Sequence, residues 1–233
     1  MFQATLFDYN GVLVDDELVH WEAFCDVLAP LGIRISESEY WQDYLGLDDA
    51  GVFRTVLQRF GKAHDESSVS GFVEAKKPRY LARARGALRG FPGAAELVRE
   101  QASRGPVVIV SGALRDEIEL GLEVLGVRDQ VQAIISAEDA PRCKPDPQGY
   151  HKGISALERL GVTDVRAQGI VFEDSVDGIA AALAAGLTTI AIAHSYPKER
   201  LEHTGAQRVV ERIGDVNAKL LSELFDEVAV QKR

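Results

Sequence analysis

Six residues suited to chemistry fall at, or just beyond, the ends of apolar runs that the sequence predicts as buried strands. They are Asp8, Ser111 with Gly112, Lys144, and Glu173 with Asp174. A carboxylate can attack a phosphate ester and carry the phosphoryl group, while a hydroxyl, a backbone amide and an ammonium group can hold the phosphate oxygens. Each residue is ordinary by itself, but together they fit phosphoryl transfer with Asp8 as the nucleophile.

The three acids of this set call for a positive charge. A phosphate dianion beside Asp8, Glu173 and Asp174 would be repelled, because two unit charges about 4 Å apart cost about 4 kcal/mol at an effective dielectric of about 20. Mg²⁺ suits carboxylate oxygens together with a substrate phosphate, and it keeps water in its remaining positions. We therefore predict that the three acids bind Mg²⁺, while Ser111 and Lys144 hold the phosphate.

These side chains can meet only if the strands carry them to one edge of a sheet. Apolar runs alternate with helical segments, which predicts an α/β fold with a Rossmann-like, doubly wound parallel sheet. Ligands bind at the carboxyl ends of such strands. Segment 12–14 is expected to form a short hairpin after Asn10 and Gly11. The expected strands are 4–7, 107–110, 133–136, 169–172 and 188–193, and the expected helices are 94–104, 114–126, 148–160, 179–185 and 214–228.

A long segment between the first strand and the rest of the sheet has a different pattern. From residue 17 to about 88, apolar residues recur at helical spacing, as in the series Trp21, Phe24 and Leu28. Several short helices packed on each other would form a separate unit at this point. The predicted domains are an α/β core, 1–15 with 90–233, and an inserted all-α helical cap domain, 16–89.

The segment Asp8-Tyr9-Asn10-Gly11-Val12-Leu13-Val14-Asp15-Asp16-Glu17 resembles the opening motif of the haloacid dehalogenase superfamily. The resemblance is to its helical-cap branch, which includes β-phosphoglucomutase and phosphoglycolate phosphatase. Residues further along the chain match that superfamily's later motifs in the same order. The resemblance implies Mg²⁺-dependent hydrolysis of a small organic phosphate through an aspartyl-phosphate on Asp8. It also implies that the backbone carbonyl of Asn10 is a metal ligand.

Asn10 departs from the superfamily's motif, in which a second aspartate acts as acid and then as base. A carboxamide can do neither, and such help is typically worth about 10²–10⁴ in rate. Three outcomes stay open: a phosphatase that obtains its proton elsewhere, with His20 the nearest candidate; a non-catalytic phosphometabolite-binding protein; and a different chemistry, since dehalogenases of the superfamily also lack this aspartate. Against the last, dehalogenases need no metal. Asn10 precedes Gly11, so slow deamidation could also restore the acid.

The cap carries the residues expected to select the substrate. Asp48 and Asp49 stand where β-phosphoglucomutase relatives usually present an arginine to a second phosphate, which argues against a phosphomutase, the further alternative. Asp48 equally suits a helix N-terminus. Lys76 and Lys77 belong to a basic cluster, for which a solvated helix face is the ordinary explanation. The functional interpretation makes Lys76, with His20 at the cap junction, a substrate-binding residue.

Composition and charge narrow the possible partners. The 233 residues are 46% hydrophobic and 27% charged, as in an ordinary globular protein. A net charge of −10 opposes binding to nucleic acid or to an anionic membrane. The two cysteines form no metal or redox motif, and no leader or membrane-spanning run is recognised. We therefore expect a cytoplasmic monomer or weak homodimer whose partner is a small phosphorylated metabolite.

Overall fold

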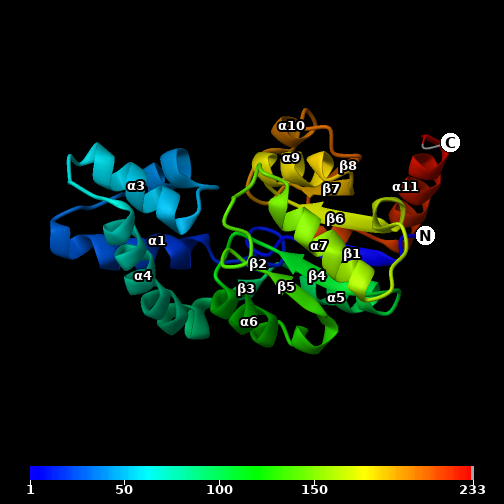
Figure 1. Ribbon diagram of the computed structural model, residues 1–233, viewed down its shortest axis with the longest axis horizontal. Helices are drawn as coiled ribbons and strands as arrows, with labels where there is room; N and C mark the ends of the chain where they lie inside the picture. The colour runs from blue at the N-terminus through cyan, green and yellow to red at the C-terminus, as the bar shows by residue number, and fades with distance from the viewer. Residues whose placement is uncertain (232–233) are drawn as a thin grey trace. The chain divides into compact units, whose positions relative to one another are not determined.

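The computed structural model describes residues 1–231, which form two compact units. The first is an α/β unit made of residues 1–15 and 89–231, and the second is a helical unit made of residues 16–88. Figure 1 shows both units with their helices and strands labelled in chain order.

A six-stranded parallel sheet, in the order β5-β4-β1-β6-β7-β8, forms the centre of the α/β unit. The predicted α/β fold with a parallel sheet is thus confirmed. β1 lies between β4 and β6, and its Leu6 is paired with Val108 and Val171. Continuous apolar runs suit these central strands because helices cover both of their faces. The strands are β1 (Ala4–Phe7), β4 (Val107–Val110), β5 (Ala133–Ile135), β6 (Gly169–Glu173), β7 (Thr188–Ile192) and β8 (Arg208–Val210).

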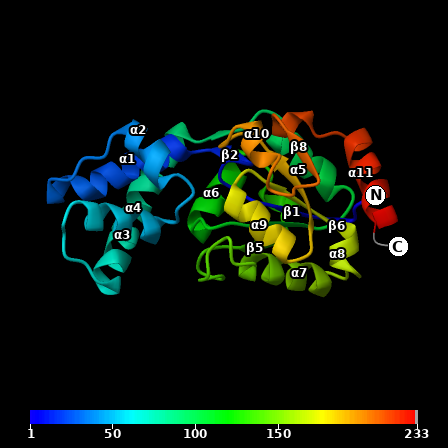
Figure 2. The ribbon, with the colours of Figure 1, turned by 90° about the horizontal axis from the view of Figure 1, so that it is seen from above.

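Helices pack on the two faces of the sheet, as alternate residues of β1 show. Leu6 lies in the hydrophobic core cluster that includes Ile154 of α7 and Ala181 of α9. Thr5 points the other way and donates a hydrogen bond to Gln101 of α5. Figure 2 shows α7, α8 and α9 on one side of the strands and α5 on the other. The helices of this unit are α5 (Ala94–Ala102), α6 (Arg115–Val124), α7 (Gln148–Arg159), α8 (Val165–Gln168), α9 (Val176–Ala184), α10 (Lys198–Leu201) and α11 (Ala218–Gln231).

Three short elements, β8, α8 and α10, were not predicted from the sequence. They have three or four residues each and bury too few apolar side chains to give a periodic signal. The last helix also begins later than the expected residue 214, because a 3₁₀ turn, Ile213–Asp215, precedes it. Asn217 then accepts a hydrogen bond from the backbone of Leu220 in the first turn of α11.

The expected hairpin at residues 12–14 is wrong. The chain turns at Gly11, whose φ is +72°, and the Gly11 amide donates to the carbonyl of Val14. β2 (Val14–Asp15) then pairs antiparallel with β3 (Arg89–Gly90), far away in the sequence. The chain therefore leaves and re-enters the α/β unit through one two-stranded ribbon.

The helical unit has a core of its own, built from aromatic and aliphatic side chains on α1, α3 and α4. Phe24 and Phe53 lie edge to face with ring centroids 5.1 Å apart, beside Leu28 and Val56. In the part of the chain that the structure describes, no helix is long and apolar enough to cross a membrane. The unit consists of α1 (Glu17–Leu28), a 3₁₀ turn (Ala29–Leu31), α2 (Glu37–Glu39), a π-helical turn (Tyr40–Tyr44), α3 (Asp49–Arg59) and α4 (Glu66–Ala87).

Lys76 of α4 is buried, so the solvated helix face expected for it is wrong. Its ammonium group lies 2.5 Å from Oδ1 of Asp49 and 2.6 Å from Nδ1 of His20. Because lysine can only donate, Nδ1 of His20 accepts, and the imidazole proton lies on Nε2, 3.2 Å from Asp16. Asp48 begins α3 by accepting from the Gly51 amide, as its helix N-cap interpretation requires.

Lys76→Met is expected to destabilise the protein by about 2 to 4 kcal/mol, because it leaves the charge of Asp49 without its cation. Oδ2 of Asp49 is already buried and has no hydrogen-bond partner among the described residues, so the carboxylate would lose its main compensation. Urea denaturation followed by circular dichroism measures the effect. Lys62→Met, at an exposed position of the helical unit, is the control and should change the free energy of unfolding by less than about 0.5 kcal/mol. Equal effects of the two substitutions would contradict this account.

Candidate active site

Asp8 follows β1 directly and lies at the carboxyl edge of the sheet. The Asp8 amide donates to the carbonyl of Phe172 at 3.0 Å, so the residue continues the pairing with β6 while its side chain leaves the sheet. Tyr9, fully buried, points elsewhere and donates to the carbonyl of Glu117 on α6 at 2.9 Å. Gly121 makes room for this ring, since a Cβ there would lie 1.8 Å from its hydroxyl oxygen. The turn after β1 is therefore anchored on both sides of the carboxylate.

Lys144 joins the candidate nucleophile to the acidic pair. The loop before α7 places its ammonium group 2.7 Å from Oδ1 of Asp8 and 2.5 Å from Oε1 of Glu173. Burial alone would lower the pKa of Lys144, but the two carboxylates outweigh it and raise that pKa above its ordinary value. Lys144 therefore remains positively charged, and its charge lies beside the carboxylate that would attack the substrate.

Glu173, at the end of β6, is fixed by contacts to both of its oxygens. Oε1 accepts from Lys144 and from the Tyr150 hydroxyl at 2.8 Å. Oε2 accepts from the Asp174 amide and from the hydroxyl of Ser175, at 3.1 Å each. A Cβ at Gly178 would lie 2.0 Å from Oε1, so the first turn of α9 leaves room for this carboxylate only with glycine there. Glu173 therefore holds Lys144 in place, whatever else it binds.

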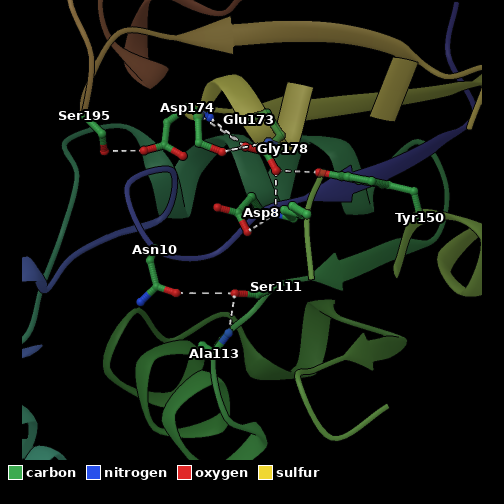
Figure 3. Close-up of polar contacts among 11 residues, drawn as sticks. Asp8, Asn10, Ser111, Ala113, Tyr150, Glu173, Asp174, Gly178 and Ser195 are labelled. Atoms are coloured by element: carbon green, nitrogen blue, oxygen red, sulfur yellow. Dashed lines mark hydrogen bonds and ion pairs between the residues drawn. The ribbon is translucent and has the colours of Figure 1, made fainter. Parts of the chain in front are cut away.

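Asp8, Glu173 and Asp174 are buried, and each offers a carboxylate oxygen within 4.8 Å of the others. When all three acids are ionised, as beside a bound cation, their negative charge exceeds the positive charge of Lys144, which contacts two of them. An all-oxygen set of this kind fits a hard divalent cation such as Mg²⁺. Figure 3 shows Asp8 between the acidic pair on one side and Ser111 on the other.

Burial raises the pKa of two of these carboxyl groups. The pKa of Asp8 rises from its ordinary value of 3.8 to about 7, through burial and the charge of Glu173 and against the attraction of Lys144. Burial, with the charges of Asp8 and Glu173, raises the pKa of Asp174 well above 3.8. A motif does not show burial, so the sequence alone gives Asp8 the ordinary pKa of an aspartate, at which it is ionised at neutral pH. A bound cation would favour the ionised forms.

The stability of metal-free protein is expected to fall as the pH rises from about 4 to about 7. In this range the unfolded chain releases the Asp8 proton while the folded protein keeps it, so raising the pH favours unfolding. A shift of this size corresponds to at most on the order of 4 kcal/mol. Urea denaturation at several pH values, with a chelator present, measures the slope. Asp8→Asn should reduce the slope, leaving the part that the raised pKa of Asp174 contributes, and an unchanged slope in that variant would contradict the raised pKa of Asp8.

Ser111 and Asn10 face each other on the opposite side of Asp8. The Ser111 hydroxyl donates to Oδ1 of Asn10 at 3.3 Å and accepts from the amide of Ala113 at 3.1 Å. Gly112, which lies between Ser111 and Ala113 in the chain, is exposed, and a Cβ there would meet no atom within 4 Å. No atom therefore fills the place where a side chain would stand at Gly112.

The structure thus brings six of the nine predicted site residues to one edge of the sheet, with Gly112 next to Ser111 as the seventh, and leaves two in the other unit. His20 and Lys76 lie in the helical unit, bonded to each other, and their role in substrate binding stays a prediction. The group at the sheet edge consists of Asp8, Asn10, Ser111, Lys144, Glu173 and Asp174.

Three contributors were missed by the sequence analysis: Tyr150, Ser175 and Ser195. Tyr150 lies within α7, so no strand-end rule points to it. Ser175 directly follows the acidic pair and begins α9, where its side chain accepts from the Gly178 amide. Ser195, which donates to Asp174, comes three residues after β7. Polar residues just beyond a strand of a parallel sheet lie at its carboxyl edge. The same rule, applied to the strand expected at 188–193, points to Ser195.

Comparison with known proteins places the chain among related sequences. The family model described as haloacid dehalogenase-like hydrolase matches residues 2–186. Validoxylamine A 7'-phosphate phosphatase of Streptomyces hygroscopicus subsp. limoneus is 30% identical over 210 residues, which cover 86% of this chain and 90% of that protein. Hexitol phosphatase B of Escherichia coli is 31% identical over 190 residues, which cover 81% and 82% of the two chains.

Solved structures agree with this placement. CbbY from Rhodobacter sphaeroides, solved in complex with phosphate, superposes with a TM-score of 0.79 at 25% identity, over 92% of this chain and 96% of that one. β-Phosphoglucomutase from Clostridium difficile superposes with a TM-score of 0.83 at 20% identity, over 99% and 100% of the two chains. At that identity the second comparison shows a shared fold alone.

Proposed function

Because the chain belongs to the haloacid dehalogenase-like hydrolases and its relatives include named phosphatases, we propose that it hydrolyses a small organic phosphate monoester with Mg²⁺, through an aspartyl-phosphate on Asp8. The observation that carries the proposal is the buried cluster in which Lys144 contacts both Asp8 and Glu173 beside Asp174. Holding like charges together away from water lowers the stability of the folded protein. A cluster of this kind is therefore typical of a functional site.

In the first step, an oxygen of Asp8 attacks the phosphorus atom as the bond to the ester oxygen breaks. The aspartate becomes a mixed anhydride, and the leaving alcohol oxygen takes up a proton from water or from the phosphate monoanion, because the Asn10 carboxamide cannot supply one. Lys144 and Ser111 compensate the charge on the phosphate oxygens as it shifts. The Ser111 hydroxyl then exchanges its bond to Asn10 for one to the phosphate.

In the second step, a water molecule attacks phosphorus and the bond between phosphorus and Asp8 breaks. Inorganic phosphate is released, and Asp8 is again a free carboxylate. This water must lose a proton, and the Asn10 carboxamide cannot take it. The proton therefore goes to solvent, to the phosphate itself or to another residue. Asn10 would instead hold the Ser111 hydroxyl until the substrate binds. Because no base stands at position 10, the second step is slow by comparison with an enzyme that has one there.

Asp8 and Asp174 would hold Mg²⁺ directly, with Glu173 and the backbone carbonyl of Asn10 completing the protein's share. The donor set fits, because the cluster is all oxygen and, once ionised, carries more negative charge than Lys144 compensates. When bound, the ion lets the phosphate dianion approach the carboxylates by screening their repulsion. Glu173, engaged by Lys144 and Tyr150, is the member whose other contacts compete most with the ion.

The substrate proposed is a phosphate ester of a small hydroxylated molecule. Two relatives bear the names of phosphatases that act on a hexitol phosphate and on validoxylamine A 7'-phosphate. In the helical unit Lys76 is bound to Asp49, so its charge is already compensated. This favours a monophosphate over a bisphosphate, as the sequence analysis also predicts.

Phosphate release from a panel of hexitol, sugar and other small phosphate esters tests the proposal. Turnover should require Mg²⁺ and stop when the ion is chelated. Hydrolysis that continues with full rate in the presence of a chelator would contradict the role given to the acidic cluster. Release from a sugar bisphosphate in preference to every monophosphate would contradict the substrate proposed.

A second candidate function is binding of a phosphometabolite with little or no turnover, and Asn10 is the observation that favours it. Isothermal titration with the same panel separates the two: binding without phosphate release supports the second candidate. A phosphomutase is less favoured, because Asp49 occupies the loop position where those relatives usually present an arginine.

A further inference from the structure

The loop between β7 and α10, residues 193–197, contacts the candidate site at Asp174. This loop has no role in the proposed mechanism. Ser195 of this loop donates a hydrogen bond from its hydroxyl to Oδ2 of Asp174. In Figure 3, Ser195 approaches the Asp174 carboxylate from the side away from Glu173. One oxygen of Asp174 therefore accepts a hydrogen bond from the loop, which restricts the rotation of the carboxylate.

The turn after Asp8 packs against the same two side chains. A Cβ at Gly11 would lie 1.9 Å from Oδ2 of Asp174 and 2.7 Å from Oγ of Ser195. Glycine is thus required there for space as well as for its φ of +72°. Because the turn, the carboxylate and the serine are in contact, a shift of any one of them would move the others.

His194 fixes the loop that carries Ser195. Its Nδ1 lies 2.8 Å from the carbonyl oxygen of Gly11, and its Nε2 lies 3.3 Å from the amide nitrogen of Ile213. A carbonyl only accepts and an amide only donates, so the ring is neutral with its proton on Nδ1. The ring also stacks on Phe91, with centroids 3.8 Å apart. Hydrogen bonds at both nitrogens and the ring contact hold the backbone on which Ser195 stands.

We propose that Ser195 is a positioning residue for the metal site: it holds Asp174 in the orientation needed to bind Mg²⁺. The inference rests on the proposed function, in which Asp174 is a metal ligand. Residues that hydrogen-bond metal ligands orient them, and their loss typically lowers metal affinity or activity about 10- to 100-fold. Without the hydroxyl, the Asp174 side chain can rotate more freely. Binding of the ion must then order this side chain, and the entropy lost in doing so weakens the binding.

Calorimetric titration of substrate-free protein with Mg²⁺ tests the inference without reference to turnover. Ser195→Ala should raise the dissociation constant for Mg²⁺ about 10-fold or more, and Ser195→Thr, which keeps the hydroxyl, should restore most of the affinity. Ser70→Ala, at an exposed position on α4, is the control and should bind like the wild type. Circular dichroism at the temperature of the titration confirms that each variant is folded.

The outcomes separate this inference from the proposed function. If the wild type binds Mg²⁺ and Ser195→Ala binds it equally well, the positioning role is overturned while the phosphatase proposal stands. Equal losses in the alanine and threonine variants would also overturn it, since the hydroxyl would then not be the group that matters. A wild type that binds no Mg²⁺ overturns both the inference and the metal dependence of the proposed function.

Discussion

Asp8→Asn is expected to lower the rate of phosphate release by on the order of 10⁴-fold or more, because it removes the carboxylate oxygen proposed to attack phosphorus in the first step. The amide has nearly the shape of the carboxylate and can still contact the cluster, so the protein should stay folded. Steady-state turnover of the best ester in the panel, with Mg²⁺ at saturation, measures the loss. The effect should appear in kcat, since the substituted group acts in the chemical step.

Asp15→Asn is the matched control for this substitution. Asp15 lies on β2, is exposed, and loses the same charge when replaced. It should leave kcat within about twofold of the wild type, because an exposed charge in water contributes little to a buried site. A variant at Asp8 that keeps a substantial fraction of wild-type turnover would show that another residue, or water directly, attacks the ester.

Asn10→Asp is expected to raise turnover by about 10²–10⁴, because it supplies the acid and base that the wild-type chain lacks at this position. Oδ1 of residue 10 already lies 3.3 Å from the hydroxyl of Ser111, so an aspartate would enter a site built for an oxygen acceptor. The gain should be largest in the step that releases phosphate from Asp8. Burst kinetics of product release, compared between the two proteins, measures each step separately.

Two controls make this result specific. Asn10→Ala removes the contact with Ser111 without adding an acid, so its turnover should not rise above the wild type. Peptide mass analysis of the wild type measures any aspartate formed by deamidation at Asn10. The Gly11 amide, which would attack the side chain in that reaction, is already bonded to the carbonyl of Val14. Wild-type turnover that scales with a deamidated fraction would mean that the amide form is inactive.

The sheet and most of the site residues could be predicted because the same positions carry both signals. A continuous apolar run such as 107–110 has few other uses than a central parallel strand, and a polar residue that follows it must lie at the sheet's carboxyl edge. The order of Asp8, Ser111, Lys144 and the acidic pair along the chain therefore predicted a common location. β8 escaped because Arg208, Val209 and Val210 are too few to make such a run.

Contacts within the helical unit could not be predicted in this way. Lys76 was expected in solvent because a run of charged residues is usually exposed, yet it is buried between Asp49 and His20. Periodicity shows which face of a helix is apolar, but not that a charged residue on the other face will meet two polar partners from distant segments. Tyr150 and Ser195 escaped for a similar reason, since their roles depend on which side chains lie across from them.

Asn10 separates two properties of the candidate site, which are the ability to bind a phosphate and the ability to exchange protons during its hydrolysis. The residues proposed to hold a phosphate and a cation lie together at one edge of the sheet, but the side chain at position 10 is a carboxamide, which cannot exchange protons. If the protein turns over, the aspartyl-phosphate should persist longer than it would beside an aspartate, because its hydrolysis lacks a base. The intermediate should then be a substantial part of the enzyme during turnover.

Borohydride trapping of that intermediate is the most direct test, because it reduces an acyl phosphate to an alcohol and leaves free carboxylates unchanged. Wild-type protein quenched during turnover with Mg²⁺ should contain homoserine at residue 8, found by peptide mass analysis, and Asn10→Asp should contain less. Turnover without any such modification at Asp8, or with the modification at a different carboxylate, would contradict the central claim.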